Sequence, residues 1–394
     1  MNHSRPRIAL TFWQWVFAVL VAGGIYATFV RFYYGLGGST HLSDSFPWGL
    51  WIGFDILCGV GLAAGGFTLA SVVHIFNIER YKPILRPAIL TAFLGYLLVI
   101  AALLIDLGRP YRIWHALVMW NPRSVMFEVA WCVMLYTTVL ALEFAPAVFE
   151  RLGWQVALRW VRAVSIPLVI AGVILSTLHQ SSLGSLYLIV PHKLYPLWYS
   201  PLLPLFFFLS ALCVGLAMTI FESWHSSRAF GRQLELPLLA SMARVLTVLL
   251  ATYLTMRFLD LYHRRALRLL LEPRTETYLF IVEILLMLVP LVLLLRRRVR
   301  TNPASLYICA VMVVLGFVSH RLNVSVTGME RGSGVSYVPK WTEVVITLSL
   351  IALGFAIFHW AAKHLPVFPK EETPPAARLP AQSATGLTPV AARK

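Results

Sequence analysis

The chain has 394 residues, of which 59% are hydrophobic and 13% charged, and its mean hydropathy is +0.74. This composition excludes an ordinary soluble domain, in which about a quarter of the residues are charged. The formal net charge of +16 does not indicate nucleic-acid binding, because the basic residues are spread through short loops and form no continuous stripe.

Ten apolar segments are each long enough to cross the ~30 Å hydrocarbon core of a bilayer. In chain order they cover about 12–31, 49–76, 87–106, 124–146, 163–182, 199–222, 239–260, 277–295, 304–320 and 341–362. Trp and Tyr gather at many of their ends, which is typical of the aromatic belt at a membrane surface. The sequence therefore predicts an all-α integral membrane protein with about ten transmembrane helices.

The distribution of Lys and Arg favours a cytoplasmic location for both termini. With that orientation, nineteen basic residues lie in cytoplasmic segments and thirteen on the opposite side. Five of these outer residues are arginines in a predicted loop at 257–274, which could dock an acidic partner, cover an anionic or carbonyl ligand, or have no role. The stretch 366–394 has no apolar period and is predicted to be a disordered cytoplasmic tail.

A weak internal repeat divides the chain into halves. Equivalent residues recur as Asp106 and Asp260, Glu128 and Glu283, and His179 and His320. Because four helices separate the copies, both face the same way, which predicts two four-helix bundles plus one extra helix at each end. The expected divisions are an N-terminal segment with the first helix (1–46), a first bundle (47–185), a second bundle (186–322), an outer loop with the last helix (323–365) and the tail (366–394).

Polar side chains of the first bundle are predicted to lie in the outer leaflet. They are Asp55, Asp106, Arg109, His115, Glu128 and His179. A carboxylate in hydrocarbon must pair, become neutral or face water, so these acids favour a polar ligand or proton transfer. Hydrogen bonds that only fix helix packing would also explain Asp55, Glu128 and His179. The second bundle has no counterpart of Asp55, which favours the first bundle as the site.

This set of residues suits a quinone, because quinone reduction needs donors to two carbonyl oxygens and a nearby acid or base. We expect Glu128, Asp55 and His179 to exchange protons, and Asp106, Arg109 and His115 to bind the quinone. A secondary transporter for a small ion could use the same residue types, and a purely structural anchor would need no ligand.

Metal centres are not indicated by the sequence. The four cysteines form no C-x-x-C pair, so no iron–sulfur or other metal site is predicted in this chain. The histidines lie near the ends of the predicted helices, and their spacing does not require a haem.

Several short motifs together resemble a known family. They lie at 47–55, 63–67, 106–110, 121–128, 179–184, 196–201, 321–323 and 337–343. Over about residues 10–365 the chain resembles the NrfD/polysulfide-reductase membrane anchors. Within that family it looks most like the integral membrane subunit of hydrogenase-2-type Ni/Fe hydrogenases, historically labelled a cytochrome b subunit.

The resemblance implies a haem-free subunit of the bacterial inner membrane that reacts with menaquinone or ubiquinone. Electrons would pass between the quinone and a docked periplasmic iron–sulfur subunit, and the Ni/Fe-type catalytic centre would belong to another subunit. Whether the chain is itself an enzyme stays open on this basis. Related anchors serve other reductases, so the membrane anchor of another NrfD-type reductase is an alternative.

Overall fold

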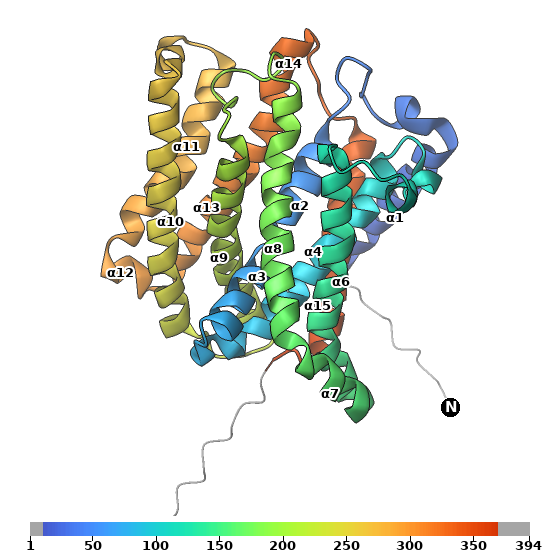
Figure 1. Cartoon of the computed structure of the whole chain (residues 1–394), viewed down its shortest axis with the longest axis vertical. Helices are drawn as coiled ribbons and strands as arrows, with labels where there is room; N and C mark the ends of the chain where they lie inside the picture. The colour runs from blue at the N-terminus through green and yellow to red at the C-terminus, as the bar shows by residue number, and fades with distance from the viewer. Residues whose placement is uncertain (1–10, 369–394) are drawn as a thin grey trace, which may run out of the picture.

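The computed structural model describes residues 11–368, and every regular element in that range is a helix (Figure 1). The expected all-α membrane protein is confirmed, because ten of its helices are long and apolar enough to cross a bilayer. Nine of these spans are built on α1 (Phe12–Ser39), α4 (Lys82–Asp106), α6 (Val125–Leu152), α8 (Ser165–Ser185), α9 (Leu203–Ala229), α10 (Leu236–His263), α11 (Thr275–Leu294), α13 (Pro303–Leu322) and α15 (Trp341–His364). Nearly all of the predicted disordered tail falls outside the described residues.

Short helical elements connect the spans. They are η3 (Glu79–Tyr81), η4 (Pro110–Arg112), α5 (His115–Val118), α7 (Gln155–Ala163), η5 (Leu186–Ile189), η6 (Ala266–Leu271), α12 (Arg297–Arg300), η7 (Asn323–Thr327) and α14 (Gly328–Ser333). We call the end of the molecule that carries Asp106 the outer end, and the end at which α6 stops the inner end.

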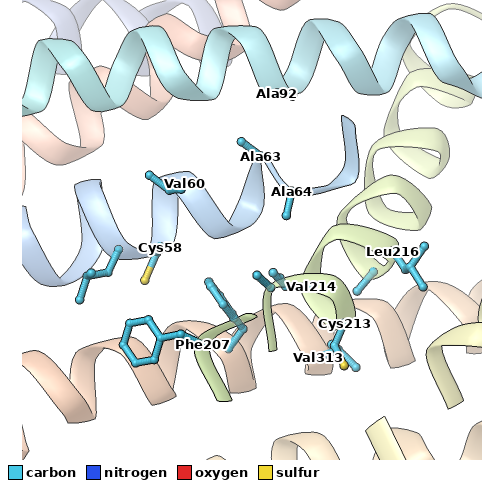
Figure 2. Close-up of a cluster of buried hydrophobic side chains, with 14 of the residues drawn as sticks. Cys58, Val60, Ala63, Ala64, Ala92, Phe207, Cys213, Val214, Leu216 and Val313 are labelled. Carbon is cyan, nitrogen blue, oxygen red and sulfur yellow. The ribbon is translucent and has the colours of Figure 1, made fainter. Parts of the chain in front are cut away.

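The remaining span, residues 51–75, is irregular. It consists of a π-helical turn η1 (Trp51–Ile56), α2 (Leu57–Leu62), α3 (Gly65–Ala70) and a second π-helical turn η2 (Ser71–Ile75). At its centre the backbone lies against α9: a Cβ atom on Gly215 would be 2.8 Å from the backbone nitrogen of Gly65. Figure 2 shows the small side chains around this crossing. Small residues let membrane helices approach closely, so this contact holds the centre of the molecule together.

The spans of each half pack mainly on one another. In the first half the irregular span contacts α4 and α8, and α6 contacts both α4 and α8. In the second half α9 and α11 each contact α10 and α13, while α8 and α9 join the halves. Helices α1 and α15 pack together and leave most of their surface exposed, as lipid-facing helices do (Figure 1). The division into two four-helix bundles stays a prediction.

Candidate functional site

Asp55 and Asp106 come together at the outer end of the first half. Asp55 lies in the π-helical turn η1 and is 8% exposed, and its Oδ2 accepts a hydrogen bond of 2.7 Å from the Thr347 hydroxyl on α15. Asp106 is the last residue of α4 and interacts electrostatically with Asp55. These two of the six predicted residues therefore share one environment, between η1, α4 and α15.

A buried arginine on α1 lies beside this pair. Arg31 is 3% exposed and donates to the carbonyl oxygens of Ile105 and Leu107, each at 2.7 Å. These bonds satisfy carbonyl groups that the end of α4 leaves open, and the guanidinium attracts the Asp106 carboxylate. From the sequence alone Arg31 counts as an outer loop charge, whereas the structure places it inside the helix packing.

Glu343 is a third acid at the outer end, and it is fully buried. Its carboxylate accepts hydrogen bonds from the backbone amides of His41 (3.2 Å) and Lys340 (2.8 Å) and from the Tyr337 hydroxyl. Burial and the bond to Glu343 raise the pKa of the Tyr337 phenol, so that Tyr337 stays protonated and keeps donating. Glu343 follows Lys340 by three residues at the start of α15 and caps its backbone amide, but Lys340 lacks the hydroxyl of a capping box, so the pattern did not single out Glu343.

His179 belongs to a different group of residues. It is fully buried on α8, and its Nδ1 lies 2.8 Å from the hydroxyl of Tyr96 on α4. The Tyr96 ring packs edge-on against Tyr136 of α6, with 4.7 Å between ring centroids. Within residues 11–368 no partner is found for Nε2 of His179, whereas the hydroxyl of Tyr136 and Oγ of Ser176 interact with each other. Buried polar atoms are normally satisfied, so this nitrogen of His179 is a candidate partner for a polar ligand or water.

Glu128 lies on α6, on the same side of the helix as Tyr136, which belongs to the group around His179. It lies in the first turn of the helix, is partly exposed, and its carboxylate has no partner in the part of the chain that the structure describes. Glu128, Cys132 and Tyr136 are four residues apart and therefore form one stripe on the helix. Burial increases along the stripe, because Cys132 is 4% and Tyr136 only 1% exposed. The stripe thus runs from a partly exposed acid to the buried His179 group.

Arg109 and His115 lie in the connection between α4 and α6. Arg109 is exposed, and His115 is partly exposed and packs edge-on against Trp114 at 4.4 Å between centroids. The structure shows no hydrogen bond or ion pair from either side chain to Asp55, Glu128 or His179. The six predicted residues therefore occupy several environments at the outer end and do not form one contiguous cluster.

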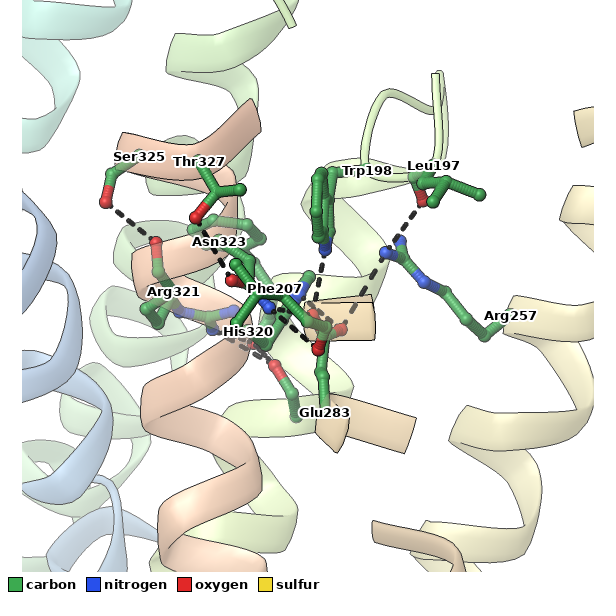
Figure 3. Close-up of polar contacts among 12 residues, drawn as sticks. Leu197, Trp198, Phe207, Arg257, Glu283, His320, Arg321, Asn323, Ser325 and Thr327 are labelled. Atoms are coloured by element: carbon green, nitrogen blue, oxygen red, sulfur yellow. Dashed lines mark hydrogen bonds and ion pairs between the residues drawn. The ribbon is translucent and has the colours of Figure 1, made fainter. Parts of the chain in front are cut away.

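The second half contains the densest buried charge network among the described residues, around Glu283 of α11 (Figure 3). Glu283 Oε2 accepts from Trp198 Nε1 (2.8 Å) and Asn323 Nδ2 (2.9 Å), and its Oε1 lies 3.0 Å from Nδ1 of His320. The guanidinium of Arg257 is 4.0 Å from the same Oε1. All four partners are buried, so the carboxylate is enclosed on every side.

Two arginines of this network show where sequence reasoning failed. The apolar pattern assigns Arg257 to an outer loop at 257–274, but it lies within α10 and is fully buried. Arg321 is fully buried on α13, where it donates to the Ser210 hydroxyl and to the Phe207 carbonyl oxygen, each at 3.0 Å. Arg257 lies inside the predicted apolar segment 239–260 and was also counted in the loop from 257. The loop assignment was wrong because α10 continues to His263 and its outer end packs inside the protein. A buried arginine needs partners from other helices, which one sequence does not reveal.

The structure also contains two cavities at the inner side. One lies between the irregular span and α9, beside Thr91 and Glu222, and has no room for a water molecule. The other, near Ser226 and Glu235, is a shallow opening of about 50 Å³. Neither is lined by Asp55, Glu128 or His179. No group of three or more His, Cys, Asp or Glu side chains in residues 11–368 could hold a metal ion.

Comparison with known proteins identifies the family. The family model described as polysulphide reductase, NrfD, matches residues 38–331. The chain belongs to the NrfD family. It is 38% identical to the probable Ni/Fe-hydrogenase 2 b-type cytochrome subunit of Escherichia coli over 86% of this chain and 88% of that protein. Among other NrfD-type relatives, the integral membrane subunit of menaquinone reductase from Nitratidesulfovibrio vulgaris is 29% identical over 91% of this chain and 93% of its own length.

A further NrfD-type relative is a selenate reductase subunit from Mesobacillus selenatarsenatis, 30% identical over 52% of this chain and 54% of that protein. These names describe membrane subunits of different oxidoreductase complexes, so the resemblance inferred from the motifs is confirmed at the level of the family. The Escherichia coli relative is named a b-type cytochrome subunit, and the expected absence of haem in this chain therefore stays a prediction.

Proposed function

We propose that this chain is the membrane subunit of a respiratory oxidoreductase complex and exchanges electrons with the membrane quinone pool. The quinone would be menaquinone or ubiquinone, and the names of the menaquinone reductase relative and of a menaquinol oxidoreductase subunit in Archaeoglobus fulgidus support this class of ligand. The observation that carries the proposal is the stripe on α6, which leads from the unpaired carboxylate of Glu128 to Tyr136, beside Tyr96 and the unsatisfied Nε2 of His179.

The chemistry of these side chains fits a quinone headgroup. When the Tyr96 hydroxyl donates to Nδ1 of His179, Nε2 carries the imidazole proton and is a donor for a carbonyl oxygen. Glu128 supplies an acid or base near the outer surface, about 12 Å along α6 from Tyr136. A bound quinone would accept or release two electrons and two protons. In this arrangement Glu128 holds the proton that is exchanged with the outer side, and His179 orients the ring.

The other predicted residues act at the edge of this site in our proposal. Asp55 and Asp106 form a second acidic position at the outer end, where Asp55 accepts a hydrogen bond from Thr347 and Asp106 is attracted by Arg31. Arg109 and His115 lie in the connection that leads from α4 to α6, where a headgroup would enter from the lipid.

We further propose that the protein lies in the bacterial inner membrane with both termini in the cytoplasm. Three of the thirteen basic residues counted on the outer side, Arg31, Arg257 and Arg321, are buried among helices. The charge bias that favours this orientation is therefore stronger than the sequence count indicates. A periplasmic iron–sulfur subunit would then dock at the outer end, and a catalytic subunit of the Ni/Fe type, or of another NrfD-type reductase, would complete the complex.

The test is Glu128→Gln in the complex isolated from its native membrane. We expect normal assembly and quinone-linked turnover at least about 100-fold lower, because a general acid–base group contributes about that much or more. Asp44→Asn is the matched control, since Asp44 is an exposed carboxylate in an outer loop of the same half. Wild-type turnover in Glu128→Gln would rule out this role.

The same preparation distinguishes the alternatives. We expect co-purified iron–sulfur and catalytic subunits, together with extractable quinone. A secondary transporter would instead move a substrate across liposomes as the isolated chain. A haem spectrum that stays with this chain after the partners are removed would show that the haem-free prediction is wrong.

A further inference from the structure

The short helix α7 lies at a membrane surface because of its place in the chain. Helix α6 ends at Leu152, Gly153 adopts a left-handed conformation with φ of 72°, and α7 begins at Gln155. Helix α8 then starts at Ser165, directly after α7. A nine-residue helix between two spans that cross the bilayer in opposite directions must lie near the headgroups, and Figure 1 shows α7 protruding beyond the inner end of α6.

The two sides of α7 have different chemistry. Leu158 is 4% exposed and anchors the helix to the bundle, whereas Val156 and Trp160 are 61% and 72% exposed. Arg159 and Arg162 project from another side, on which Gln155 also lies. An exposed indole beside exposed arginines is typical of a helix that lies in the interface with its apolar side toward the acyl chains.

The charges around α7 are unbalanced. Glu150 accepts two hydrogen bonds from Arg86, at 2.8 and 2.9 Å, and one from Arg162 at 2.9 Å. Arg151 and Arg159 are exposed, and their side chains have no hydrogen bond or ion pair within residues 11–368. Glu150 therefore balances part of the charge of Arg86 and Arg162, and Arg151 and Arg159 add two unpaired positive charges to this inner corner of the protein.

We propose that α7 and the adjoining end of α6 form a binding site for an anionic phospholipid. The phosphate would lie against Arg151 and Arg159, and the acyl chains would cover Trp160 and Val156. Clusters of arginine next to membrane-spanning helices attract anionic lipid headgroups, and the exposed indole places the site at headgroup depth. Such a lipid would bridge α6, through Arg151, and α7, through Arg159.

The test titrates lipid into the delipidated full-length protein in detergent and follows the midpoint of thermal unfolding. We expect phosphatidylglycerol to raise the midpoint of the wild type and phosphatidylcholine to have little effect. In the double variant Arg151→Gln/Arg159→Gln the apparent affinity for phosphatidylglycerol should fall at least about five-fold, as expected for the loss of basic residues at an anionic surface. Trp160→Ala should weaken binding of both the lipid and its lyso form.

The matched control is Arg297→Gln/Arg298→Gln, which removes two exposed arginines from α12 at the same side of the membrane, where the helix has arginines but no tryptophan like the exposed Trp160 of α7. This variant should keep the wild-type affinity. Equal losses in the two double variants would show a general charge effect and overturn a site at α7, as would an unchanged affinity in the α7 variant. Competition by soluble glycerol phosphate as strong as that by the lipid would show a free phosphate site instead and would also overturn the proposal. Size-exclusion profiles before each titration exclude misfolded variants.

Discussion

The two halves of the molecule place similar residues in different environments. In the second half Glu283 and His320 are in direct contact, 3.0 Å apart, and Trp198, Asn323 and Arg257 surround the carboxylate. In the first half no hydrogen bond or ion pair joins Glu128 to His179. Glu128 is partly exposed and has no partner among the described residues. Nε2 is unsatisfied in both His179 and His320, so the two histidines do not differ in this respect.

This difference separates two uses of the same residue types. A carboxylate enclosed by four partners is fixed and cannot readily accept a proton or a ligand, so the network around Glu283 is suited to holding helices together. A partly exposed carboxylate remains available for exchange. Unsatisfied buried atoms occur in both halves, including Nε2 of His320, so the contrast between the halves rests on the carboxylates: Glu128 is partly exposed and Glu283 is enclosed.

The largest effect is expected from a substitution in the buried network around Glu283. Glu283→Gln removes the only carboxylate between Arg257 and His320 and leaves a buried guanidinium uncompensated, which costs about 3–5 kcal/mol. We expect poor assembly and a strongly lowered midpoint of thermal unfolding for the purified protein.

The control for this variant is Glu276→Gln, on the same helix. Glu276 pairs with Arg331 at 3.9 Å near the surface, and such pairs contribute about 1 kcal/mol or less. If Glu283→Gln assembled normally but lost quinone-linked turnover, the second half would hold the functional carboxylate, and the comparison would be reversed.

The second prediction concerns the first half. Tyr96→Phe removes the hydroxyl that bonds to Nδ1 of His179 and so frees the imidazole to change its orientation and tautomer. We expect quinone-linked turnover to fall about ten-fold with a loss of stability of only about 1 kcal/mol. Tyr253→Phe is the control, because Tyr253 is equally buried and packs near His320 in the second half. Equal effects of the two substitutions on turnover would remove the distinction between the halves.

Much of the fold was predictable from the sequence, because ten apolar segments of membrane length leave few alternatives. The pairs Asp106 and Asp260, Glu128 and Glu283, and His179 and His320 were also visible as a pattern. What each pair does was not, because it depends on residues from other helices. Trp198 and Asn323 enclose Glu283 from distant parts of the chain, and Tyr96 reaches His179 across 83 positions. The buried positions of Arg31, Arg257 and Arg321 were missed for the same reason: an arginine near a helix end reads as a loop charge unless its partners are known.

The smallest effect is expected at Asp55, whose environment is intermediate between that of the enclosed Glu283 and that of the partly exposed Glu128. Asp55 is nearly buried like Glu283 but has a single side-chain partner, the Thr347 hydroxyl. Thr347→Val keeps the shape of the side chain and removes that donor, at a cost of about 1 kcal/mol. We expect a small decrease in the unfolding midpoint together with a roughly two- to five-fold higher KM for a soluble quinone analogue, which is the effect of one hydrogen bond.

Thr138→Val is the matched control for this change, because the exposed Thr138 hydroxyl bonds only to the Met134 carbonyl oxygen of its own helix. An unchanged KM in Thr347→Val, with a lowered midpoint, would assign Asp55 to helix packing, alongside Glu283. A raised KM would place Asp55 with Glu128, because a carboxylate that only packs helices can lose a donor without altering how the quinone binds. The measurement thus decides whether Asp55 serves helix packing, as Glu283 does, or quinone binding, together with Glu128.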